Sequence, residues 1–163
     1  MFAYFDIETD GLEQQQCAFK CGVVHIDGMM HAFTDAVAMA TFLVEARTRA
    51  TIVSFNGLSF DFQVLAHKCE PALQRQVAAL AISEQHVDIM FAFAGAHGYY
   101  ASMQSFAESL GLSKTWDGAA AAASEDADAI LAYCKQDVRV LQKVHEAALQ
   151  NGFLARKTKA GRP

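Results

Sequence analysis

The sequence predicts an α/β fold in which a mixed five-stranded sheet is flanked by helices. Three runs rich in β-branched and aromatic residues come first, at residues 1–7, 17–27 and 29–33, and turn residues separate them, which is typical of an antiparallel meander. From Asp35 onward, segments with helical spacing alternate with short apolar runs, which is typical of parallel strands joined by helical crossovers. The meander and the parallel strands are expected to share one sheet.

The first half of the chain carries clear signals at the ends of its elements. Asp27-Gly28 is typical of a hairpin turn before the return strand. Asp35 is a candidate N-cap for a helix that runs to Arg49. Residues 51–55 predict a buried strand parallel to the first one, and Asn56-Gly57 ends it.

The second half is predicted to be mainly helical. Ser59 is a candidate N-cap for the helix that contains Asp61, and Ser124 is a candidate N-cap for a long last helix. Asn151-Gly152 ends that helix. The elements expected between them are a helix at 71–84, a strand at 86–90, a loop at 95–100, a helix at 102–112 and an alanine-rich connector at 114–123.

Length and composition indicate one domain with a sizeable core. The chain has 163 residues, of which 53% are hydrophobic, and only two prolines. We expect residues 1–152 to form the domain and residues 153–163 to be a short basic tail, solvated or in contact with a phosphate backbone. The net charge of 13 − 18 = −5 argues against a general nucleic-acid binder, unless several acids hold metal ions.

The N-terminus and the cysteines favour a cytoplasmic protein. No basic segment precedes Asp6, so a signal peptide is not expected. The uncharged run 89–107 is long enough for a membrane span, but glycine and polar residues interrupt it, so we expect no membrane association. The four cysteines have no zinc-ligand spacing and are expected to be free thiols: Cys17, Cys21, Cys69 and Cys134.

Two acids at the end of the first strand suggest a metal site. Asp6 and Glu8 are two residues apart, so their side chains point to one face of a strand, about 7 Å apart. Like charges held in this way repel one another, and a Mg²⁺ or Mn²⁺ ion between them would remove the repulsion. The alternative is a hairpin end with two solvated acids.

Asp61 is a third candidate acid. It falls in the first turn of its predicted helix, where a carboxylate complements the helix dipole. It also falls at the C-terminal edge of the predicted sheet, where ligands bind in open α/β sheets. Both interpretations remain open on the residues alone.

Tyr133 and Asp137 form an unusual pair on the last helix. They are four residues apart, so they share a helix face. That face is otherwise apolar, and an acid on it is costly unless it is paired or bound to metal. Together with Asp6, Glu8 and Asp61, Asp137 supplies enough carboxylates for a two-metal centre.

Three motifs resemble the DEDD superfamily of 3′→5′ exonucleases, which has a ribonuclease H-like fold. The first is Phe-Asp-Ile-Glu-Thr-Asp-Gly-Leu at residues 5–12. The second, Asn-Gly-Leu-Ser-Phe-Asp at residues 56–61, is similar to the form in exonuclease domains of family B DNA polymerases. The third, Tyr-Cys-Lys-Gln-Asp at residues 133–137, is similar to the tyrosine (DEDDy) branch of these DnaQ-like proteins.

The resemblance implies a role for each motif residue. Asp6, Glu8 and Asp137 would hold one Mg²⁺ or Mn²⁺ ion, and Asp6 and Asp61 would hold a second. Tyr133 would orient the attacking water. Around this centre, the residues expected to contact the substrate are Thr9, Leu12, Asn56 and Phe60.

The implied function is metal-dependent hydrolysis of phosphodiester bonds from the 3′ end of single-stranded nucleic acid. DNA is favoured because the second motif resembles polymerase domains, and a polymerase or another replication or repair protein is a candidate partner. The alternatives are a 3′→5′ exoribonuclease, a ribonuclease H-type endonuclease, and a non-catalytic nucleic-acid-binding or partner-docking module. Tyr99 and Tyr100 are expected in the core, with stacking on bases as the alternative.

Overall fold

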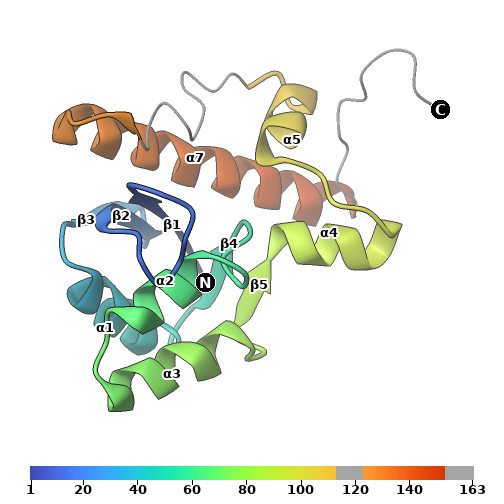
Figure 1. The fold of residues 1–163 in the computed structure, drawn as a ribbon. Helices are drawn as coiled ribbons and strands as arrows, with labels where there is room; N and C mark the ends of the chain where they lie inside the picture. Colours follow the sequence, from blue (N-terminus) through green and yellow to red (C-terminus); the bar gives the residue numbers. More distant parts are fainter. Residues whose placement is uncertain (113–122, 153–163) are drawn as a thin grey trace.

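The computed structural model of the chain describes residues 1–112 and 123–152. Five strands form one sheet in the order β3-β2-β1-β4-β5 (Figure 1). The strands are β1 (Phe2–Thr9), β2 (Phe19–Ile26), β3 (Met29–Phe33), β4 (Thr51–Ser54) and β5 (His86–Asp88). β2 is antiparallel to β1 and β3, whereas β4 is parallel to β1 and β5. The predicted mixed sheet of five strands is confirmed.

Helices cover both faces of this sheet. The described helices are α1 (Ala36–Ala46), α2 (Asp61–His67), α3 (Pro71–Ala81), α4 (Ile89–His97), α5 (Met103–Ser109) and α7 (Ala127–Asn151). Figure 1 shows α1, α2 and α3 below the sheet and α7 crossing above it. α4 extends sideways from the β5 edge in the same view. The sheet is thus the middle layer, between α7 on one side and α1, α2 and α3 on the other.

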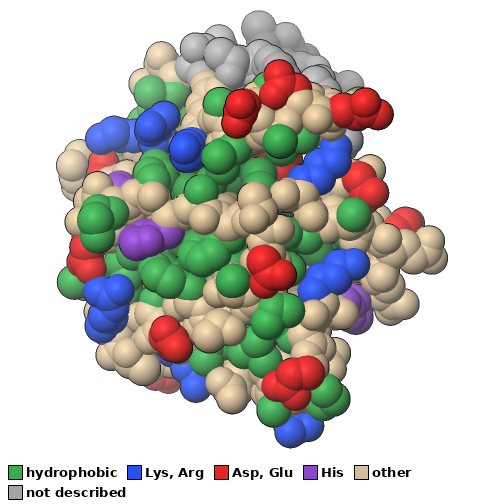
Figure 2. Space-filling view, turned by 90° about the vertical axis from the view of Figure 1, so that its left-hand side faces the viewer, with side chains coloured by type: hydrophobic (Ala, Val, Ile, Leu, Met, Phe, Trp, Pro, Cys, Tyr) green, Lys and Arg blue, Asp and Glu red, His purple; other side chains and the backbone are tan. Residues whose placement is uncertain are grey.

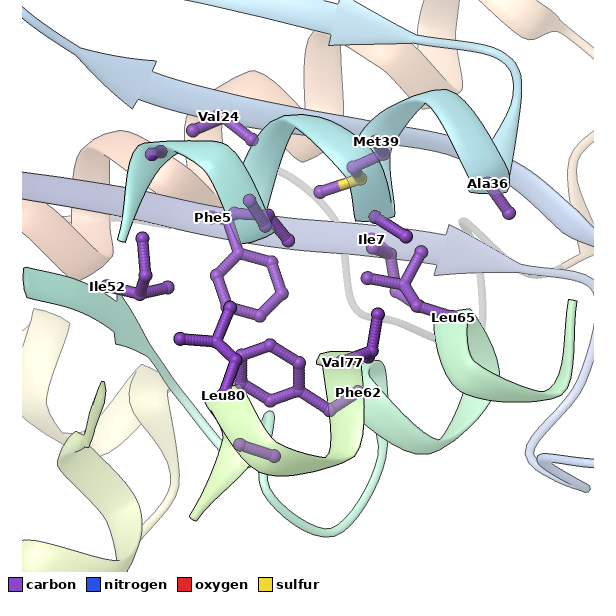
Figure 3. Packing of buried hydrophobic residues seen from close by; sticks show 14 of the residues in the cluster. Phe5, Ile7, Val24, Ala36, Met39, Ile52, Phe62, Leu65, Val77 and Leu80 are labelled. Atoms are coloured by element: carbon purple, nitrogen blue, oxygen red, sulfur yellow. The ribbon is translucent and has the colours of Figure 1, made fainter. Parts of the chain in front are cut away.

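The alternation of side chains along β1 divides the interior into two cores. Phe5 and Ile7 point toward α1, α2 and α3, where they join the cluster drawn in Figure 3. The ring of Phe5 meets that of Phe62 edge-on, with 5.0 Å between their centroids. Tyr4 points the other way, into the core beneath α5 and α7. Asp6 and Glu8 follow Tyr4 on the α7 side because side chains two residues apart share a face.

The hairpin signals and one helix cap behave as predicted. Asp27 and Gly28 both have positive φ, 54° and 74°, which is the backbone of a type I′ hairpin turn. The Asp35 carboxylate accepts a hydrogen bond of 2.7 Å from the backbone N–H of Ala38 and caps α1. Both signals act between residues that are close in sequence, so they can be predicted without knowledge of the tertiary structure.

Two other predicted caps are wrong. Phe60, not Ser59, is the N-cap residue of α2, and no side chain caps that helix. Asp126, not Ser124, caps α7, and its carboxylate accepts from the N–H groups of Asp128 and Ala129 at 3.1 and 3.0 Å. Ser and Asp are both good caps, so residue type alone does not decide between Ser124 and Asp126.

The segment after β5 differs most from the prediction. The strand ends at Asp88 rather than at residue 90, and α4 starts immediately. The Asp88 carboxylate accepts from the N–H groups of Met90 and Phe91, which turns the chain into a helix. Tyr99 and Tyr100 follow this helix and are exposed, contrary to the expectation that they lie in the core.

Residues 113–122, which include all but the last residue of the connector predicted at 114–123, and the basic tail at 153–163 lie outside the described residues. The domain boundary at residue 152 stays a prediction. The uncharged run 89–107 is divided between α4 and α5. No helix within residues 1–112 and 123–152 combines the length and apolarity that a membrane crossing requires.

Replacement of Leu80 by alanine should lower the free energy of unfolding by about 2–5 kcal/mol, because it leaves a cavity in the core of Figure 3. Leu149→Ala on α7 is the matched control, since its side chain is 58% exposed whereas Leu80 is fully buried. Urea denaturation of both variants measures the difference. Equal losses of stability would contradict this description of the core.

Candidate metal and nucleic-acid site

Asp6 and Glu8 lie side by side beneath α7. Glu8 is buried and Asp6 is half-buried. One possible ligand atom from each of Asp6, Glu8 and Cys134 lies within 4.8 Å of the other two. The predicted pair of acids therefore converges on one point, and a thiol that was not predicted joins it.

Helix α7 brings the second half of the site. Tyr133 and Asp137 are both buried, one turn apart, and the Tyr133 hydroxyl donates a hydrogen bond to Asp137. Burial raises the pKa of Tyr133 far above its usual value, and the charges of Asp137, Glu8 and Asp6 raise it further. The phenol thus lies in the field of all three carboxylates, and it shares a helix face with Asp137, as the spacing predicted.

Asp61 reaches the same stretch of β1 from another side. β4 pairs with β1 only from Phe2 to Tyr4, and the Asp61 carboxylate accepts the backbone N–H of Ile7 at 3.2 Å. Burial, with a smaller contribution from the charge of Asp88, raises the pKa of Asp61 to about 7. Asp61 is therefore held at the segment between Asp6 and Glu8.

The loop after β1 is ordered by its own polar groups. The Thr9 hydroxyl donates to the carbonyl of Gly11 at 2.6 Å. The Asp10 carboxylate accepts from the N–H of Ala18 at 2.6 Å. Leu12 lies on this loop and is 84% exposed. Thr9 is thus buried next to the acids, and Leu12 is available for contact with a ligand.

The turn after β4 has a backbone conformation and a close packing that few residue types tolerate. Asn56 has a φ of 64°, which asparagine tolerates better than most residues. A Cβ on Gly57 would lie 2.4 Å from the Ser54 hydroxyl oxygen, so only glycine fits. Phe60 packs against the core beneath the sheet.

Asp88 holds this turn in place. Its carboxylate accepts from the N–H groups of Asn56 and Leu58 at 3.0 and 2.9 Å, besides the two N–H groups at the start of α4. The sequence alone left the role of Asp88 undecided. An Asp directly before an apolar helical segment is an N-cap signal, but the bonds to Asn56 and Leu58 come from a distant part of the chain.

Cys134 is a site residue that the sequence reasoning did not single out. Its sulfur lies 3.4 Å from the backbone oxygen and 3.8 Å from the Oδ2 atom of Asp6. The signal that could have found it is its position, next to Tyr133 on the buried stripe of α7. The site therefore combines hard oxygen ligands with one soft atom.

A pocket of about 450 Å³ opens beside the site, between β2 and the residues that precede and begin α7. Asp10, Lys20 and Ile130 contribute to its lining, and the Lys20 ammonium donates to the carbonyl oxygen of Ser124 at 2.8 Å. Asp6, Glu8, Asp61 and Asp137 are not among its lining residues. The carboxylates therefore lie outside the pocket.

The acids present fit a hard divalent cation. Glu8, Asp61 and Asp137 are buried carboxylates, and burial without a compensating charge is costly. Carboxylate oxygens are the ligands that Mg²⁺ and Mn²⁺ prefer. Asp6 and Glu8 have oxygens close enough to share such an ion, with Asp137 and Asp61 beside the same strand end.

Comparison with protein families identifies the chain. The model of the RNase_H superfamily matches residues 3–149. The chain belongs to the RNase H superfamily. Its order of strands and its helices on both faces are thus those of a ribonuclease H-like domain, which confirms the predicted fold.

Solved structures with the same fold include parts of larger proteins. The family B DNA polymerase of the hyperthermophilic archaeon Pyrobaculum calidifontis has a TM-score of 0.63 at 16% identity, over 91% of this chain and 24% of the polymerase. Exonuclease I has a TM-score of 0.51 at 12% identity, over 89% of this chain and 43% of that protein. A structure described as the apo form of a nuclease has a TM-score of 0.58 at 18% identity, over 92% of this chain and 74% of that one.

These identities show a shared fold and no more. This RNase H superfamily chain spans about a quarter of the polymerase and less than half of exonuclease I. No curated protein sequence matched.

Replacement of Asp88 by asparagine should destabilise the protein by about 1–3 kcal/mol, because the amide cannot accept all four backbone N–H groups as the carboxylate does. Asp35→Asn is the matched control, since asparagine is an equally good cap. Thermal denaturation compares the two variants. If Asp88→Asn were as stable as Asp35→Asn, the four hydrogen bonds would not hold the turn.

Addition of Mg²⁺ should raise the melting temperature, because a cation relieves the repulsion between Asp6 and Glu8; a concentration of 100 times the dissociation constant gives about 2.7 kcal/mol. The shift should be lost in Asp6→Asn and kept in Asp128→Asn, which changes an exposed acid of α7. Differential scanning calorimetry with Mg²⁺ or EDTA measures it. An equal shift in both variants would place the ion elsewhere.

Proposed function

We propose that this chain is a metal-dependent 3′→5′ exonuclease that acts on single-stranded nucleic acid, with DNA favoured, and releases nucleoside 5′-monophosphates. One observation carries the proposal: Tyr133 and Asp137 are buried on α7 in the field of Asp6 and Glu8. The stability of the fold does not require such a concentration of acids. A module that only binds nucleic acid does not require it either.

Four carboxylates would hold two divalent cations, Mg²⁺ or Mn²⁺. Asp6, Glu8 and Asp137 would bind one, and Asp6 and Asp61 the other. Such ions lower the pKa of a bound water and stabilise the charge on the leaving oxygen of a phosphodiester. The carboxylates neutralise the ions and fix their positions, and α7 excludes bulk water from them, as the low exposure of Glu8 and Asp137 indicates.

Tyr133 would position the nucleophile. Because its pKa is raised by burial and by three neighbouring carboxylates, the phenol keeps its proton at neutral pH. A neutral phenol is a poor general base, but it can hold a water by hydrogen bonding in the orientation that attack requires. Loss of the hydroxyl should therefore slow the reaction without abolishing it.

The loops around the acids suit the end of a single strand. Leu12 is exposed on the loop after β1, where an apolar side chain can wedge against the last bases irrespective of sequence. Thr9 is the last residue of β1, and Asn56 lies two residues beyond the end of β4. A 3′-terminal nucleotide held by these residues would present its phosphodiester to the site.

Surface charge favours weak binding by the isolated chain. The net charge is −5, and the face in Figure 2 carries both basic and acidic side chains. A strong basic footprint is what gives many nucleic-acid-binding proteins their affinity. We therefore include a polymerase or another replication or repair protein as a proposed partner that would deliver the 3′ end.

The test is degradation of 5′-labelled single-stranded DNA and RNA in Mg²⁺, Mn²⁺ or EDTA. We expect a metal-dependent ladder that shortens from the 3′ end, faster on DNA. Asp6→Asn should have no detectable activity, and Tyr133→Phe should be about 10- to 100-fold slower, in the range for groups that orient a metal-bound ligand.

Two exposed positions provide matched controls, Asp128→Asn and Tyr99→Phe, and both should keep wild-type rates. Faster loss of RNA would identify an exoribonuclease. Binding of either strand without cleavage, by folded wild-type protein with metal, would leave a non-catalytic binding module and refute the proposed activity.

A further inference from the structure

Two cysteine side chains meet beneath the proposed active site. Cys21 lies on β2 directly opposite Glu8 of β1, so the two side chains share the face of the sheet toward α7. Cys134 lies on α7, and both thiols belong to the core between that helix and the sheet. The Cys134 thiol is hydrogen-bonded to Cys21. Two segments far apart in sequence thus bring two thiols into contact.

One member of the pair, Cys134, contacts Asp6. The Cys134 sulfur is 3.4 Å from the backbone oxygen of Asp6 and 3.8 Å from its Oδ2 atom. Cys134 also lies between Tyr133 and Asp137 on one turn of α7. A change in the bonding of Cys134 is therefore transmitted directly to three of the proposed catalytic residues.

The remaining cysteines differ in position. Cys17 and Cys69 pack in or against the core on the opposite side of the sheet. Their thiols contact the backbone oxygens of Gln14 and Leu65, respectively. They serve as internal controls for a reaction that requires two neighbouring thiols.

We propose that Cys21 and Cys134 form a site of reversible oxidation by hydroperoxides, which joins them in a disulfide and switches off the nuclease site. The formation of the disulfide rests on the position of both thiols in one core between β2 and α7 and on their hydrogen bond, and it does not depend on the proposed function. Its effect on activity rests on the proposed function.

The chemistry balances with one peroxide per disulfide. One thiol sulfur attacks the peroxide, the O–O bond breaks, and a sulfenic acid and one water form when hydrogen peroxide is the oxidant. The second sulfur attacks the sulfenic sulfur, the S–O bond breaks, and a second water leaves with the thiol protons. The two sulfurs are oxidised to a disulfide, and the peroxide is reduced to two waters. A dithiol reverses the result by exchange.

The disulfide would alter the site by moving Cys134. A sulfur–sulfur bond of about 2.05 Å draws the Cys134 sulfur toward β2 and away from Asp6. Tyr133 and Asp137 are carried by the same helical turn, so their positions relative to β1 change with it. Displacement of reacting groups by about 1 Å can cost on the order of 100-fold in rate.

The experiment compares reduced full-length chain with chain treated with hydrogen peroxide. Intact mass should fall by two hydrogens, free thiols should fall from four to two, and non-reducing peptide mapping should link Cys21 to Cys134. Cleavage of single-stranded DNA should fall on the order of 100-fold and return after dithiol treatment. Cys21→Ser should keep its basal activity and resist peroxide, with Cys21→Ala as a second variant if the serine destabilises the core.

Cys69→Ser is the matched control and should be inactivated like the wild type. Retention of four free thiols, or a link between other cysteines, would overturn the proposal. A Cys21–Cys134 disulfide with unchanged cleavage would overturn the regulatory effect. Because the mass and the peptide map do not depend on activity, a disulfide in a chain with no nuclease activity would refute the proposed function and leave the oxidation site standing.

Discussion

Asp6 and Glu8 project from adjacent positions of one strand face into a space that α7 closes, and Asp137 enters the same space from above. Charges of one sign in a poorly hydrated space repel one another strongly, so their retention needs a rigid frame, and the proposed divalent cation would compensate them. The frame is the core around them: Tyr4 and Cys21 on the sheet, and the apolar stripe of α7. The carboxylates that the proposed chemistry requires are therefore the same groups whose repulsion destabilises the fold.

The opposite face of β1 supplies the rigidity. Phe5 and Ile7 alternate with the acids and are buried under α1, α2 and α3. A shift of one residue in the register of β1 would exchange the two sets, placing aromatic side chains in the site and carboxylates in the apolar core. The strong apolar anchoring of Phe5 and Ile7 thus fixes where Asp6 and Glu8 point.

Sequence patterns predicted most of this fold, and the shared helix face of Tyr133 and Asp137, because these signals are local. The hairpin Asp27-Gly28 and the spacing of Tyr133 and Asp137 depend on neighbours within one turn, and both were correct. The failures share a different cause. The start of α4 and the exposure of Tyr99 depend on where β5 ends and on what covers the helix. The contact of Cys134 with Asp6 joins residues 128 positions apart, which no local pattern reveals.

The four hydrogen bonds of Asp88 have a consequence for how the chain can vary in length. One carboxylate ties the turn at Asn56 and Leu58 to the first N–H groups of α4. The chain length at the ends of β4 and β5 is thereby fixed. An inserted or deleted residue there would separate the N–H donors from the carboxylate that they share. Residues 98–100, between α4 and α5, are exposed, and the rings of Tyr99 and Tyr100 contact Phe93 and Phe91 of the adjacent helix rather than a shared acceptor. Relatives of this chain should thus differ in length there and keep a constant length around Asp88.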